Sequence, residues 1–144
     1  MKGEIRLRFW EAKLYSNLEI RASGDIVARV VEQVRGYRDL VEEHREEIVE
    51  SYHKVARNLV DMAKWVAPER KVGPLVKRVA GGEPVEIDKP PMVGLIIYDY
   101  DDAQKRSDRW RNDLGKLEKE GIHVQSAGDA KNIKLRGPIL TTIS

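Results

Sequence analysis

Residues 92–98 read Met-Val-Gly-Leu-Ile-Ile-Tyr, in a chain of 144 residues. A continuous apolar run of this length predicts a strand that is buried on both faces, as in the parallel sheets of α/β proteins. The acidic stretch 99–102 ends the run, and a helix is predicted from about residue 103 to 120, where Gly121 stops it. A buried strand that leads into a helix predicts an α/β layered domain with at least one parallel crossover.

Upstream of this run, residues 4–15 are predicted to form a second strand. One of its faces carries Ile5, Leu7, Phe9, Glu11, Lys13 and Tyr15. A 3.6-residue apolar spacing then predicts a helix from Ile26 to Val41 and a second helix from about residue 45 to 66. The acidic segment 42–44 is interpreted as a bend between them, and one helix of about 40 residues is the alternative. Pro68 ends the helical pattern.

Residues 67–92 are the irregular part of the chain. A short helix is predicted over 74–79, ended by the two glycines at 81 and 82, and an extended piece over 85–87. Two further short strands are predicted at 122–125 and 133–135. We interpret residues 1–144 as a single domain, with residues 67–92 as an insert at the edge of the sheet.

Composition narrows the function classes. The apolar fraction is 41% and the charged fraction 35%, as in a polar globular protein, and the net charge is only +2. Charge alone therefore does not indicate a nucleic-acid-binding protein. The chain contains no cysteine, which excludes disulfides, thiol nucleophiles and cysteine-ligated metals and is compatible with a reducing cytoplasm. No apolar run approaches the roughly 20 residues of a membrane span.

Two pairs of polar residues fall on faces that are otherwise apolar. Glu11 and Lys13 are two residues apart on the first predicted strand, so both side chains point to one face. Gln33 and Tyr37 are four apart on the helix that follows, so they also share a face. Buried groups of this kind are costly unless they are paired. The structural alternatives are a salt bridge at a sheet edge for the first pair and a satisfied core amide for Gln33.

In combination, these motifs resemble the PD-(D/E)XK nuclease superfamily, which has the restriction-endonuclease-like fold, and in particular its RecB-like branch. Glu11 and Lys13 match the acidic-x-Lys strand motif, and Gln33 and Tyr37 match the Gln-x-x-x-Tyr helix motif. The resemblance covers residues 4–42 and 92–126. It implies a mixed sheet flanked by helices and metal-dependent hydrolysis of phosphodiester bonds in DNA, in microbial DNA processing or in defence.

The resemblance also implies roles for the four residues. Glu11 would bind Mg²⁺ or Mn²⁺, and Lys13 would orient or deprotonate the attacking water. Gln33 would fix that water or a phosphate, and Tyr37 would lie near the backbone of the nucleic acid. These four residues are the predicted catalytic residues.

The chain departs from the superfamily pattern at one position. The aspartate expected on a strand before Glu11 is missing, because the first aspartate is Asp25. We therefore expect an N-terminally incomplete fold, either truncated or degenerate. Asp99 is the candidate for a second metal ligand, because it ends the buried strand together with Asp101 and Asp102. The structural alternative is that Asp101 or Asp102 caps the next helix.

A basic segment and an exposed edge leave two further hypotheses open. The helix predicted for residues 103–120 begins with basic residues around a tryptophan, and further basic residues follow the helix. Together these side chains could bind phosphates, or they could form a solvated face. They are Lys105, Arg106, Arg109, Trp110, Arg111, Lys131, Lys134 and Arg136. An inactive nuclease-like module that binds nucleic acid or a partner protein is the first alternative function. The second is a structural module that associates with itself or a partner through an exposed sheet edge.

Overall fold

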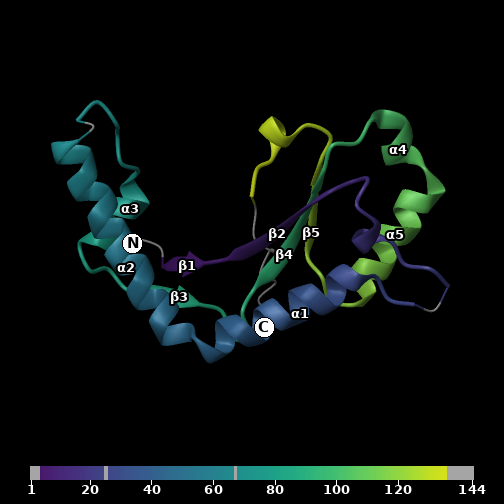
Figure 1. The fold of residues 1–144 in the computed structure, drawn as a ribbon, viewed down its shortest axis with the longest axis horizontal. Coiled ribbons are helices and arrows are strands. Elements are labelled where there is room, and N and C mark those ends of the chain that lie inside the picture. Colours follow the sequence, from purple (N-terminus) through teal and green to yellow (C-terminus); the bar gives the residue numbers. More distant parts are fainter. Residues whose placement is uncertain (1–3, 25, 67, 136–144) are drawn as a thin grey trace, which may run out of the picture. The chain divides into compact units, whose positions relative to one another are not determined.

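A computed structural model describes residues 4–24, 26–66 and 68–135, and these fall into two compact units (Figure 1). The first, which we call the helical unit, contains the described residues up to Leu7 and the segment Leu40–Pro91. The second, the sheet unit, contains Arg8–Asp39 and the described residues from Met92 onward. Each unit holds a small parallel sheet, so the chain is a mixed α/β protein.

Three parallel strands form the sheet of the sheet unit. The strands are β2 (Phe9–Leu14), β4 (Val93–Tyr98) and β5 (Val124–Ala127), in the order β2-β4-β5. The apolar run 92–98 therefore supplies the central strand, and the prediction of a buried strand is confirmed, because its residues from Val93 to Ile97 are buried. Helix α1 (Arg29–Glu43) lies in the chain between β2 and β4, as the predicted parallel crossover requires.

The core of this unit lies on one face of the sheet. Helix α5 (Asp108–Lys119) and α1 supply most of its helical side chains, and β4 supplies the sheet side chains: Val30, Val31, Val34, Trp110 and Leu117 from the helices, and Val93, Leu95 and Ile97 from β4. The register of the parallel pair sets Glu11 beside Leu95 and Lys13 beside Ile97. Register partners share a face, so both polar residues of β2 lie on the side of the sheet that faces the helices.

The late helix predicted for 103–120 is two helices, α4 (Asp102–Arg106) and α5. Asp101 caps α4, since its carboxylate accepts the backbone N–H of Gln104, whose side chain accepts the N–H of Asp101 in return. Ser107 then caps α5 by accepting the N–H of Trp110. The hydroxyl of Ser107 competes with helix continuation, which explains the break. The capping alternative for Asp101 is confirmed.

The helical unit contains α2 (Arg45–Trp65), α3 (Pro74–Ala80) and the parallel pair β1 (Ile5–Leu7) and β3 (Val85–Ile87). His44 interrupts the helical pattern between α1 and α2 with φ −106° and ψ 23°, so the prediction of two helices is confirmed. The prediction of one strand over 4–15 is wrong. The chain leaves the first strand at Arg8, and β1 and β2 belong to different sheets because they pair with β3 and β4.

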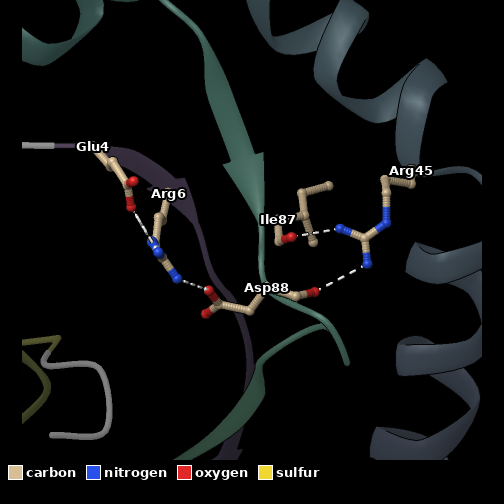
Figure 2. Close-up of polar contacts among 5 residues, drawn as sticks. All are labelled: Glu4, Arg6, Arg45, Ile87 and Asp88. Carbon is tan, nitrogen blue, oxygen red and sulfur yellow. Dashed lines mark hydrogen bonds and ion pairs between the residues drawn. The ribbon is translucent and has the colours of Figure 1, made fainter. Parts of the chain in front are cut away.

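Two arginines satisfy the polar groups at the end of β3 (Figure 2). Arg45, at the start of α2, donates to the backbone carbonyls of Ile87 and Asp88. Arg6 of β1 pairs with the carboxylates of Asp88 and Glu4 at 2.5 and 2.6 Å. These two carboxylates raise the pKa of Arg6, so the guanidinium stays charged while it links β1 to the chain beyond β3.

Three further predictions differ from the structure. Residues 133–135 do not form a strand within the described chain; they follow a 3₁₀ turn, η2 (Ala130–Asn132), which Asp129 caps. Another such turn, η1 (Leu18–Ile20), lies between β2 and α1, and α1 begins three residues later than predicted. Both sheets are parallel over the described residues, whereas a mixed sheet was expected.

Gly94 marks a close approach on the other face of the central strand. A Cβ atom at this position would lie 2.6 Å from Cζ3 of Trp10 and 3.1 Å from the carbonyl oxygen of His123. We expect Gly94→Ala to destabilise the sheet unit by about 1–3 kcal/mol, as overpacking of a core does. Urea unfolding followed by circular dichroism measures this. Gly36→Ala is the control, because its Cβ would meet nothing within 4 Å; an equal loss in both variants would contradict the prediction.

Candidate functional site

The two polar residues of β2 form an ion pair on the helix-facing side of the sheet. Nζ of Lys13 lies 2.9 Å from Oε1 of Glu11. The Lys13 side chain is only 12% exposed, so its ammonium has lost most of its water shell. A charge this far out of water requires partners, and one carboxylate is the first of them.

A second carboxylate completes the environment of this ammonium. Glu19 of η1 places its Oε2 2.6 Å from Nζ of Lys13. Asn17 holds the turn in shape by accepting the backbone N–H of Glu19 at 2.8 Å, and the fully buried Ile20 anchors it to the core. Glu11 and Glu19 therefore lie on either side of one ammonium and are close neighbours.

Gln33 of α1 joins the same group through Glu19. Its amide nitrogen Nε2 donates to Oε1 of Glu19 at 3.3 Å. Its amide oxygen Oε1 is buried and has no hydrogen-bond partner among the described residues. Buried polar atoms without partners are rare in folded proteins, so this acceptor needs an explanation. The site cluster, as we name it, consists of Glu11, Lys13, Glu19 and Gln33.

Charge pairing shifts the protonation of two members of the site cluster. The hydrogen bond with Glu19 is the main cause that raises the pKa of Lys13, with Glu11 adding to it, while burial acts in the opposite direction. The hydrogen bond from Lys13 is likewise the main cause that lowers the pKa of Glu19. The pair therefore stabilises the fold over the neutral range. That contribution is lost as pH falls below the ordinary carboxyl range, or rises through the raised lysine value.

The structure does not bring the remaining predicted site residues into the cluster. Tyr37 lies one turn after Gln33 on α1, is 42% exposed, and has no hydrogen bond to the cluster within the described part of the chain. Asp99 follows β4 in the left-handed region, at φ 66°, and is exposed. Across residues 4–24, 26–66 and 68–135 no group of three or more acidic, histidine or cysteine side chains is arranged to hold a metal.

The basic segment is exposed in part. Lys105, Arg106 and Arg109 lie on the surface of α4 and α5, and Arg111 pairs with Asp108 at 2.7 Å. Trp110 is 2% exposed and packs against Tyr15 and Tyr100, so it is a core residue and cannot stack on a base. Arg136 lies outside the described residues.

Sequence reasoning missed two acidic residues that the structure makes central. Glu19 belongs to the site cluster, and Asp113 of α5 is 3% exposed and pairs with Arg21 at 2.7 Å. The sequence did contain a signal for the turn that holds Glu19 and Arg21, the partner of Asp113. Asn17 is a capping residue that follows β2 after a two-residue turn, and it caps a turn in which a charged, an apolar and a charged residue alternate: Glu19, Ile20 and Arg21.

Comparison with known proteins adds no family assignment. No family model matches the chain, and neither a curated protein nor a solved structure matches it. Among the described residues, no helix is long and apolar enough to cross a membrane.

Proposed function

We propose that this chain is a metal-dependent nuclease that hydrolyses phosphodiester bonds of DNA, with the site cluster as its active site. The observation that carries this proposal is the arrangement around Lys13: one partly desolvated ammonium between two carboxylates, beside an amide oxygen that lacks a partner. Purely structural ion pairs seldom leave a neighbouring buried acceptor unsatisfied. Negatively charged oxygens and a free carbonyl oxygen are the donor set that Mg²⁺ or Mn²⁺ takes.

The residues of the cluster fit such a cation. Glu11 and Glu19 would hold it, and the amide oxygen of Gln33 is free to accept from a water in its coordination shell or to contact it. Asp99 is not needed for this arrangement, because Glu19 takes the place of the second carboxylate. A divalent cation supplies Lewis-acid polarisation of a phosphate and a more acidic water.

Lys13 would act as a donor in this arrangement. Its pKa is raised, so at neutral pH it is an ammonium and cannot accept a proton while both carboxylates remain on it. It would orient the attacking water and offset the charge that develops on the phosphoryl oxygens. Withdrawal of Glu19 toward a cation would remove the largest cause of the raised pKa and bring Lys13 closer to the range of a base.

Substrate binding would draw on the exposed cations of α4 and α5. Lys105, Arg106 and Arg109 belong to the same unit as the site cluster. Their contacts would be to phosphates and therefore independent of sequence. Such a surface is compatible with a role in microbial DNA processing or defence, which the resemblance to the PD-(D/E)XK superfamily implies.

One observation favours a second function, a module that binds nucleic acid without cutting it. Lys13 already pairs with both carboxylates, and removing it from them costs the ion pairs that hold the cluster together. In that case the cluster would be structural and the exposed cations would be the functional surface.

A cleavage assay separates the two functions. Supercoiled DNA, linear duplex and single-stranded DNA are incubated with the full chain and Mg²⁺ or Mn²⁺, with and without EDTA. We expect cleavage that needs the metal and that Glu11→Gln abolishes. Glu32→Gln is the matched control, since Glu32 is an exposed acid of α1 next to Gln33 in the chain. DNA binding by the folded wild type without cleavage of any substrate would overturn the nuclease proposal and support the second function.

A further inference from the structure

An arginine on helix α1 lies beside the site cluster and takes no part in the reaction as proposed. Arg29 is the first residue of α1 and stands four residues before Gln33. Residues four apart share a helix face, with Cβ atoms about 5–6 Å from each other. Gln33 donates to Oε1 of Glu19, so this face of α1 is turned toward the turn η1 that carries Glu19. Arg29 therefore lies one helical turn from the contact between α1 and the cluster.

The charge of Arg29 acts on the carboxylate of Glu19. The hydrogen bond from Lys13 is the main cause that lowers the pKa of Glu19, and the positive charge of Arg29 adds to it through space. A Coulomb interaction weakens with distance and is screened by water, so this effect agrees with the placement that the helix face gives. Arg29 thus borders the cluster on the side of Glu19.

Arg29 differs from the other arginines of α1 because its donors are free. Arg35 pairs with Glu120 at 2.6 Å, and Arg38 donates to the carbonyl of Gly121 at 2.9 Å. Within residues 4–24, 26–66 and 68–135, by contrast, Arg29 makes no hydrogen bond or ion pair, and it is exposed. A guanidinium carries five N–H donors in a fork that matches the oxygens of a phosphate. Arg29 is therefore available to a phosphate that approaches the cluster.

The site cluster is most open to solvent where Arg29 borders it. The Glu19 side chain is 29% exposed, against 22% for Glu11 and 12% for Lys13. A phosphodiester strand therefore reaches the cluster from the side of Glu19. The cluster holds two carboxylates against one ammonium, so without a further cation it repels that strand. A guanidinium on this side offsets the repulsion.

We propose that Arg29 binds a phosphate of the DNA backbone next to the scissile phosphate and so holds the strand across the site cluster. This inference rests on the proposed function, because it takes the cluster as the active site. The scissile phosphate itself is left to Lys13 and the divalent cation, so Arg29 touches the substrate but not the reacting atoms. A phosphate contact carries no base information, so Arg29 would strengthen binding to DNA of any sequence equally.

Binding of the full chain to a short fluorescent DNA duplex, followed by anisotropy in EDTA over a series of NaCl concentrations, tests this contact without cleavage. Arg29→Gln should weaken binding about tenfold, as the loss of a charge-assisted hydrogen bond does, and should reduce the slope of log Kd against log salt concentration by about one. Arg29→Lys keeps the charge and should restore the slope.

Arg35→Gln is the matched control for the loss of one positive charge on the same helix. Arg35 is held by Glu120, so this variant should leave the affinity and the slope close to those of the wild type. Circular dichroism verifies that all the variants fold. A wild type that does not bind the duplex at the lowest salt concentration, or equal changes in Arg29→Gln and Arg35→Gln, would overturn the proposal.

Cleavage kinetics separate this inference from the nuclease function. In a chain that cleaves DNA, Arg29→Gln should raise KM and change kcat little, because the contact is the same in the ground state and the transition state. Cleavage by the wild type, with an unchanged salt slope in Arg29→Gln, would refute the contact and leave the nuclease function standing. A slope that depends on Arg29 without cleavage of any substrate would refute the nuclease function and keep Arg29 as a phosphate contact of a DNA-binding module.

Discussion

Asp113→Ala is expected to cost about 3–5 kcal/mol of unfolding free energy, the largest loss of stability among the variants considered for this chain. The Asp113 side chain is 3% exposed, and its carboxylate lies 2.7 Å from the guanidinium of Arg21. Arg21 also donates to the carbonyl of Tyr15 at 2.5 Å and stacks over the ring of that tyrosine at 4.3 Å. Removal of the carboxylate would leave the arginine largely buried without its counter-charge.

Urea unfolding followed by far-UV circular dichroism measures this loss. Asp108→Ala is the matched control on the same helix, since Asp108 forms an ion pair of the same length with Arg111 but is 98% exposed. That pair should contribute less than about 1 kcal/mol. A double variant, Asp113→Leu with Arg21→Met, should recover most of the loss, because apolar replacement of a buried pair is often neutral. Equal losses for Asp113→Ala and Asp108→Ala would contradict the expectation.

The elements that could be predicted from sequence are those with a regular pattern. Strand β4 was predictable because residues 93–97 include no polar side chain, which is typical of a strand buried on both faces. The structure buries all five of these residues. Helices α2 and α3 were predictable from apolar spacing and from Pro74, which starts α3. The break at Arg8 was not, because the alternation of side chains continues through it and the change of partner from β3 to β4 is a tertiary event.

The site was predictable only in part, for a related reason. Glu11, Lys13 and Gln33 lie on regular elements, so their spacing indicated which faces they share, and the structure joins them in one cluster. Glu19 lies on a 3₁₀ turn, where no period links a residue to a face, and only the capping by Asn17 fixes its direction. Trp110 was interpreted as a surface residue because it stands among basic residues, whereas its ring is buried against Tyr15 and Tyr100.

If the site cluster is the active site of a nuclease, Lys13→Met should raise the affinity for Mn²⁺ and lower the rate of DNA cleavage. The Lys13 ammonium now occupies the space between Glu11 and Glu19, where it competes with any divalent cation for the same oxygens. Its replacement by an uncharged side chain of similar length should therefore raise the affinity of the chain for Mn²⁺, by roughly tenfold. The same change removes the donor that orients water, so cleavage should fall by about 10²–10⁴-fold.

Glu19→Gln should change both quantities in the same direction. It removes one of the two carboxylates, so Mn²⁺ affinity and cleavage should both fall. Lys13 and Gln33 donate to different oxygens of Glu19, so the single amide oxygen keeps one of these two hydrogen bonds in place. Isothermal titration with Mn²⁺ measures affinity in the absence of DNA and is therefore independent of activity. Lys77→Met, an exposed lysine of α3, controls for the loss of one positive charge. If Lys13→Met weakened Mn²⁺ binding instead, the ammonium would be holding the carboxylates in place for the metal. The prediction that Lys13 and Mn²⁺ compete for the same oxygens would then be wrong.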